Sequence, residues 1–333
     1  MKIRLALEAA AATLVVACAF LAAAGNGDVE ITPKARRSID SGLRYLAKTQ
    51  LEDGSWKTAA FGAPTAVASL AGLAFMSDGH LPGRGKYAGN VARALDYVLK
   101  SAQPTGLLEY GTPHHAMYSH AFSTLFLAEA WGMTARPDIR DKLKNAVDLI
   151  IRTQNREGGW RYEPKVADAD ISVTVSQIVA LRAAANAGIA VPRETVDNAI
   201  GYLRKCVRPD GGFSYQAASG ESAFPRSGGA LACFALTGLS GAPEVSRDVN
   251  YLLKTRDYAG RFFYYGQYYS AQGIHLAAPD KWPEWYRFIA GLLGGKQAAA
   301  GSWNAPGEEA VQSTAMSVLI LTIPNGYLPL YQR

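Results

Sequence analysis

Residues 50–56 read Gln-Leu-Glu-Asp-Gly-Ser-Trp, and residues 154–160 read Gln-Asn-Arg-Glu-Gly-Gly-Trp. Each string follows a segment whose apolar residues recur at spacings of three and four, which is typical of a helix with one buried face. The Gln, Gly and Trp hold the same places in both strings; they are Gln50, Gly54 and Trp56, then Gln154, Gly158 and Trp160. A pattern that returns in the same register predicts a repeat protein.

Four further segments carry weaker copies of this pattern. A third copy ends in Gly211 and Phe213, with Phe in place of Trp, and the last copy ends in Gly301 and Trp303. Two degenerate copies lie at 94–107 and 249–262, which brings the total to six. Each copy is one amphipathic helix followed by a glycine-containing turn.

A second apolar segment follows each turn, and a helix that is apolar on all sides is a buried one. These predicted inner helices are Thr65–Met76, Ser119–Ala130, Ser172–Ala184, Gly228–Leu239, Tyr264–Leu276 and Val311–Ile323. No alternation of period two is long enough to predict a sheet. The sequence therefore predicts an all-α fold of about six outer and inner helix pairs, which can close into a two-layered ring.

The motif has a structural explanation. Glycine permits the tight, left-handed backbone at the end of a helix. The aromatic side chain can pack back over the turn, and the Gln amide can bond exposed backbone groups of the next repeat. This interpretation assigns the motif to holding neighbouring outer helices together.

The strings at 50–56 and 154–160 resemble the repeats of squalene and oxidosqualene cyclases, and related repeats occur in protein prenyltransferase β subunits. The resemblance covers about residues 38–323 and implies an α/α toroid of the terpenoid cyclase and prenyltransferase type. It also implies a central cavity lined by the inner helices. The resemblance is more specific for the fold than for an activity, because function depends on the residues of a site.

Class II terpene cyclases carry an Asp-x-Asp-Asp-Thr run where an inner helix begins, and residues 168–174 are similar to it. Asp168 and Asp170 fill two of the acidic positions, Ile171 takes the place of the last one, and Thr174 is displaced. By resemblance, Asp168 and Asp170 are the candidate catalytic residues, with Asp170 as a general acid. The alternative is that Asp170 caps the inner helix, since helix amino ends favour an ionised Asp.

Further polar and aromatic residues are candidates for lining a cavity. Tyr118 and His120 lie near the start of the second inner helix, and the fifth carries tyrosines that spacing places largely on one face. Glu309 opens the sixth inner helix, where it caps the helix or pairs with Asp170 across the ring as a glycosidase requires. The candidate lining residues are Tyr118, His120, Thr174, Tyr264, Tyr265, Tyr268, Tyr269 and Glu309.

Three functions remain open at this point. The first is a toroid whose cavity holds an apolar or isoprenoid small molecule without catalysis, and the second is an active terpenoid cyclase. The third is a non-catalytic scaffold at the cell envelope, or a toroid that binds or processes a glycan. We expect no metal site and no cofactor, since the cysteines and histidines do not show the spacing of a zinc site.

The amino-terminal segment predicts export. Residues 1–24 combine a short basic start with an Ala-rich apolar run and small residues, which is typical of a signal peptide; an uncleaved anchor or a lipid attachment remains open. Residues 25–37 are the expected linker and 38–333 the toroid. We therefore expect a periplasmic or cell-envelope location and possible membrane association. The net charge is +6, but the basic residues form no stripe, which argues against nucleic-acid binding.

Overall fold

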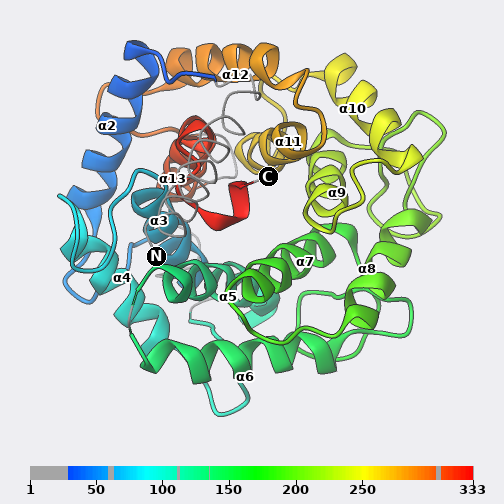
Figure 1. Ribbon diagram of the computed structural model, residues 1–333, viewed down its shortest axis with the longest axis horizontal. Coiled ribbons are helices and arrows are strands. Elements are labelled where there is room, and N and C mark those ends of the chain that lie inside the picture. The colour runs from blue at the N-terminus through cyan, green and yellow to red at the C-terminus, as the bar shows by residue number, and fades with distance from the viewer. Residues whose placement is uncertain (1–28, 59–63, 111–112, 135, 305–308, 333) are drawn as a thin grey trace, which may run out of the picture.

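Helices arranged in two concentric layers make up the protein. The computed structural model describes residues 29–58, 64–110, 113–134, 136–304 and 309–332, and within these ranges it contains twelve α-helices and no strand. Outer and inner helices alternate along the chain, and the inner ones surround a common axis (Figure 1). The all-α toroid of about six helix pairs is therefore confirmed.

The outer layer consists of α2 (Pro33–Thr49), α4 (Ala88–Lys100), α6 (Asp138–Thr153), α8 (Arg193–Lys205), α10 (Pro243–Thr255) and α12 (Trp282–Lys296). The inner layer consists of α3 (Thr65–Ser77), α5 (Ala116–Met133), α7 (Ile171–Asn186), α9 (Phe224–Leu236), α11 (Phe263–Ala277) and α13 (Ala310–Leu321). Each inner helix packs against the next, and α13 contacts both α3 and α2, which closes the ring.

Burial explains why the layers sort as they do. In α2, Ile39, Leu43 and Leu46 are buried and lie on one face, as the period of an amphipathic helix requires. In α3, twelve of the thirteen residues are buried. The outer helices therefore cover an inner ring whose residues are mostly buried.

The fourth inner helix differs from its predicted range of Gly228–Leu239, because it begins at Phe224. Pro225 stands in its first turn, where a missing backbone N–H has no consequence. Gly228 lies inside the helix, where α9 packs closely against α11. A Cβ at this position would lie 2.2 Å from the Ser270 Oγ of α11. The sequence suggests a helix start at these glycines, whereas the structure uses Gly228 for close helix packing.

At five of the six repeat junctions, the glycine turn packs against the backbone of the next outer helix. Gly158 has φ +98°, and a Cβ there would lie 2.1 Å from the Asn198 carbonyl oxygen of α8. The turn is left-handed, and it leaves no room for a side chain. The same close approach recurs at Gly54, Gly106, Gly211 and Gly301.

The Gln and Trp of the motif bond backbone carbonyls. The Gln154 Nε2 donates to the Gly158 oxygen at 2.8 Å and to the Thr195 oxygen, at the start of α8, at 2.9 Å. The Trp160 Nε1 donates to the Ile150 oxygen at 2.8 Å, which ties the turn to the helix before it. The same bonds recur around Gln50 with Trp56 and around Gln297 with Trp303.

The last of these bonds joins the two ends of the ring. The Gln297 Nε2 donates to the Ser38 oxygen of α2 at 2.9 Å, so residues 259 positions apart fasten the sixth repeat to the first. Ring closure thus uses the same amide contact as the internal junctions.

The carboxyl-terminal segment lies across one end of the inner ring (Figure 1). Its short helix Pro329–Tyr331 packs against α5 and α7, and the His275 Nε2 near the end of α11 lies 3.1 Å from the Tyr331 oxygen. The tail therefore covers the carboxyl ends of inner helices. Their amino ends, where the Asp168–Thr174 segment lies, are at the other end of the ring.

The predicted signal peptide at 1–24 and residues 25–28 of the predicted linker lie outside the described residues. The linker bounds of 25–37 were too long, because α2 already begins at Pro33, with Thr32 as its N-cap. Among the described helices, none is both long enough and apolar enough to cross a membrane.

Candidate functional site

Asp170 is the residue on which the candidate site is built. It immediately precedes α7, is fully buried, and its Oδ1 accepts hydrogen bonds from the Ser172 and Val173 amides at 2.9 and 3.0 Å. Its own amide donates to the Trp160 oxygen at 3.0 Å, which fixes Asp170 to the turn that carries Gly158 and Trp160. Asp170 therefore caps α7 from a rigid position.

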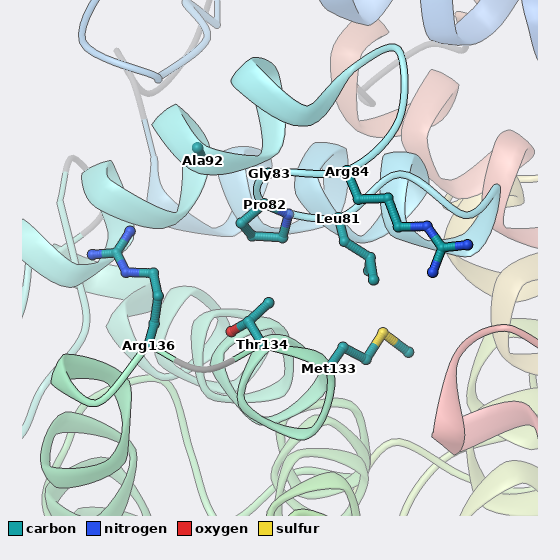
Figure 2. A pocket seen from close by; sticks show the side chains of 8 residues that line it. All are labelled: Leu81, Pro82, Gly83, Arg84, Ala92, Met133, Thr134 and Arg136. Atoms are coloured by element: carbon teal, nitrogen blue, oxygen red, sulfur yellow. The ribbon is translucent and has the colours of Figure 1, made fainter.

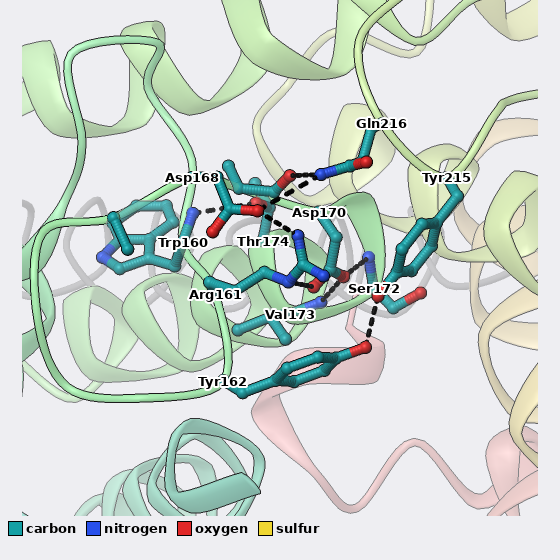
Figure 3. Close-up of polar contacts among 12 residues, drawn as sticks. Trp160, Arg161, Tyr162, Asp168, Asp170, Ser172, Val173, Thr174, Tyr215 and Gln216 are labelled. Carbon is teal, nitrogen blue, oxygen red and sulfur yellow. Dashed lines mark hydrogen bonds and ion pairs between the residues drawn. The ribbon is translucent and has the colours of Figure 1, made fainter. Parts of the chain in front are cut away.

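The second oxygen of Asp170 faces Arg161, as Figure 3 shows. The Arg161 Nε lies 3.4 Å from the Asp170 Oδ2, and the same guanidinium forms a short ion pair with the exposed Asp168. The guanidinium also lies over the rings of Tyr162 and Tyr215, 5.0 and 5.6 Å from their centroids. One arginine thus links both acidic residues of the motif to two aromatic rings.

Burial decides the acidity of Asp170. It raises the pKa to about 6, although the two capping amides, Arg161 and the Tyr215 hydroxyl each lower it. The buried carboxyl therefore holds its proton at a higher pH than an ordinary Asp does.

Four half-buried tyrosines surround the amino end of α7; we call Tyr118, Tyr162, Tyr215 and Tyr265 the tyrosine cluster. The Tyr162 and Tyr215 hydroxyls hydrogen-bond each other, and the Tyr265 hydroxyl donates to the Ser172 oxygen at 3.3 Å. Tyr118 lies against Tyr162, with ring centroids 6.1 Å apart. Burial raises the pKa of Tyr118 and of Tyr265, so both stay neutral.

Two of the predicted lining residues, His120 and Thr174, are buried and bond backbone groups instead of lining a cavity. His120 is fully buried; its Nδ1 accepts from the Leu108 amide, and its Nε2 lies 3.1 Å from the Ala146 oxygen. Burial lowers the pKa of His120 to about 4, so the ring is neutral. Thr174 is also buried, and its Oγ1 accepts from the Trp160 amide at 3.1 Å.

The other tyrosines of α11 are packed rather than half-exposed. Tyr264, Tyr268 and Tyr269 are each 1% exposed, and the rings of the last two lie 4.8 Å apart. Of the α11 tyrosines singled out in the sequence, Tyr265 is the one that belongs to the tyrosine cluster.

Glu309 stands at the N-cap position of α13. Since α13 packs between α11 and α3 while α7 packs between α5 and α9, Glu309 and Asp170 open inner helices on opposite sides of the ring.

Sequence reasoning missed Arg161, Tyr162 and Tyr215. A signal was available, because Tyr162 and Tyr215 stand two positions after the motif aromatics Trp160 and Phe213 of successive repeats. Equivalent positions in adjacent repeats point to one place in space.

A cavity of about 580 Å³ lies away from the axis, between the 81–84 loop, α4 and the carboxyl end of α5 (Figure 2). It is bordered by Leu81, Pro82, Gly83, Arg84, Ala92, Met133, Thr134 and Arg136. No residue named from the sequence as a lining residue borders it.

In the part of the chain that the structure describes, no three His, Cys, Asp or Glu side chains gather as metal ligands. Cys206 and Cys233 are buried and unbonded to each other.

The raised pKa of Asp170 predicts a pH-dependent stability. Because its folded-state pKa of about 6 exceeds the ordinary 3.8, the stabilising effect of its proton is complete below pH 3.8 and is lost as the pH rises through 6. Relative to Asp170→Asn, the wild type should lose about 2.4 kcal/mol of unfolding free energy between pH 4 and pH 7. Urea unfolding at the two pH values measures this, with the exposed Asp168→Asn as control. Equal pH slopes for wild type and Asp170→Asn would contradict it.

Known proteins share part of this sequence. No family model matches the sequence. Drimenyl diphosphate synthases of Streptantibioticus cattleyicolor and Streptomyces showdoensis are 28% identical over 182 residues, which are 54% of this chain and 32% of each relative. The chain thus spans about a third of the length of these curated relatives.

Solved structures share the fold at lower identity. The type II terpene cyclase MstE from Scytonema matches with a TM-score of 0.62 and 15% identity, over 89% of this chain and 100% of that one. An inactive variant of the α-1,6-mannanase GH76A of a Salegentibacter species matches with a TM-score of 0.65 and 10% identity, over 87% and 98%. The chain is therefore a terpenoid cyclase-like α/α toroid, as the resemblance of its repeats predicts.

Proposed function

We propose that this chain is a binding toroid that holds an apolar, isoprenoid-type ligand against the tyrosine cluster and does not convert it. The observation that carries the proposal is the state of Asp170. One of its oxygens caps α7 and the other faces Arg161, while the next motif position is the fully buried Ile171.

The chemistry of alkene protonation explains why this matters. Protonating an isoprenoid double bond requires an unusually strong acid, and a second carboxylate or a tuned hydrogen-bond network must hold its proton. Here burial makes Asp170 a weaker acid than usual, with a pKa of about 6. Ile171 also removes the second carboxylate that the cyclase motif supplies at this position.

The surroundings of Asp170 suit an apolar ligand. The tyrosine cluster offers four half-buried aromatic rings, and such rings contribute a large apolar contact area with fixed geometry. The charge of Arg161 is balanced by Asp168 and Asp170. The drimenyl diphosphate synthases to which the chain is similar carry a terpenoid name, which supports an isoprenoid as the ligand class.

A terpenoid cyclase is the second candidate. It is favoured by the raised pKa of Asp170, which keeps a proton on a buried carboxyl near pH 6. A glycan-processing toroid is supported by the fold alone, through the α-1,6-mannanase structure. The expected location remains export to the periplasm or envelope, on the pattern of residues 1–24, and fractionation of cells expressing the full chain tests it.

Mass spectrometry of small molecules that co-purify with the protein tests the proposal. We expect an acyclic isoprenoid of unchanged mass and connectivity from both wild type and Asp170→Asn, because Asn keeps the helix cap. Recovery of a cyclised product from wild type, and of its acyclic precursor from Asp170→Asn, would establish the cyclase instead. A bound oligosaccharide would contradict both.

A further inference from the structure

One buried acidic residue breaks the regularity of the repeat junctions. At five junctions the turn glycine approaches a carbonyl of the next outer helix, and the residue after that carbonyl is small in four of them: Ala94 after Arg93, Ala146 after Asn145, Ala199 after Asn198, and Gly42 after Ser41. At the junction of Gly211 with α10, the carbonyl belongs to Arg247 and the next residue is Asp248.

Asp248 is 1% exposed, and neither of its carboxylate oxygens has a hydrogen-bond partner among the described residues. Taking an unpaired carboxylate out of water costs several kcal/mol, on the order of what breaking a buried ion pair costs. Burial raises the pKa of Asp248, and the acidic side chain of Asp210 raises it further. Among the described residues, no basic side chain therefore forms an ion pair with Asp248.

The same junction also lacks the usual motif residues. Phe213 replaces Trp, and Val207 stands where the other strong repeats have Gln. The Arg204 Nε bonds the Glu244 Oε1 at 3.1 Å on the outside of this junction, but this pair does not involve Asp248.

Asp210 lies in the turn that packs against the backbone just before Asp248. Asp210 is fixed in the turn, where its Oδ1 accepts from the Gly212 amide at 3.1 Å and from the Ser222 Oγ at 2.7 Å. The Arg247 carbonyl faces the same turn, since a Cβ on Gly211 would lie 2.8 Å from its oxygen. Burial raises the pKa of the Tyr251 phenol, and Asp210 and Asp248 raise it further, whereas Arg226 lowers it.

We propose that Asp248 and Asp210 bind a divalent cation of the calcium type where α10 meets the 208–213 turn. Calcium takes carboxylate and carbonyl oxygens together with water, in a flexible geometry, so two carboxylates can suffice when carbonyls and waters complete the shell. The cation supplies the counter-charge that Asp248 lacks and fastens a junction without a Gln clamp.

Thermal unfolding of the full chain tests this site. After treatment with a chelator, adding about 1 mM Ca²⁺ should raise the Tm by roughly 5 °C, whereas Na⁺ at the same ionic strength should not. Asp248→Asn should abolish the shift, and Asp210→Asn should weaken calcium binding about tenfold in a calorimetric titration. Asp197→Asn, which removes an exposed carboxylate from α8, is the matched control and should keep the full shift.

A different set of results would contradict the cation site. If neither Ca²⁺ nor Mg²⁺ shifts the wild type, and Asp248→Asn is more stable than wild type at pH 7 but not at pH 4, the carboxyl holds a proton and no cation. If Asp248→Asn fails to fold, Asp248→Ala replaces it, because Ala stands at the equivalent positions 94 and 199.

Discussion

Gly158→Ala is expected to lower the free energy of unfolding by on the order of 3–5 kcal/mol, one of the two largest effects that we predict. A Cβ at this position would lie 2.1 Å from the Asn198 carbonyl oxygen, and the backbone has φ +98°. Since the atom in the way is backbone, the turn and α8 must move apart. That movement would also lengthen the bond from the Gln154 Nε2 to the Thr195 oxygen.

Gly188 provides the matched control for this substitution. It has φ +81°, but nothing lies within 4 Å of a Cβ built there. Gly188→Ala should therefore cost only about 1 kcal/mol, from backbone strain alone. Urea unfolding followed by far-UV circular dichroism measures both variants. Equal losses would show that the close approach of the turn to α8 contributes nothing.

Trp160→Ala is expected to cost about 3–5 kcal/mol, because it removes a large side chain that is 2% exposed. It also leaves the Ile150 oxygen without the 2.8 Å bond from the indole nitrogen. We expect a lower urea midpoint with little change in helix content below the transition.

Trp160→Phe separates the two contributions. Phe213 occupies the equivalent place in the next repeat, so the ring position accepts Phe, and the loss should be about 1–2 kcal/mol. A Trp160→Phe variant as unstable as Trp160→Ala would mean that the indole hydrogen bond, rather than packing, stabilises the turn.

Periodicity and the repeat predicted most of the fold. The stretch Gln50–Trp56 and its copies located the outer helices, and uniform apolarity located the inner ones, because burial on all sides leaves that pattern directly in the sequence. Helix starts were less accurate, as the fourth inner helix shows. Gly228 packs against Ser270 of α11, and local periodicity does not show this contact because the two helices are distant in the sequence.

The candidate site was predicted only in part. Asp170 was found from its motif, but Arg161 and Tyr215 lie in irregular segments where no periodicity indicates direction. Helical spacing grouped the tyrosines of α11 without saying which of them pack in the core, and that depends on neighbouring helices. The sequence predicts that His120 lines a pocket, because it does not show the buried partner of the ring, the Ala146 oxygen of another repeat.

The central claim is that the ligand lies at the tyrosine cluster. An isoprenoid probe carrying a photoreactive benzophenone, cross-linked to the full chain and mapped by peptide mass spectrometry, tests it most directly. We predict labelled peptides containing Tyr118, Tyr162, Tyr215 or Tyr265, with competition by the unmodified isoprenoid. Labelling confined to the outer cavity, at Leu81 to Arg84 and Met133, would contradict the proposed binding site.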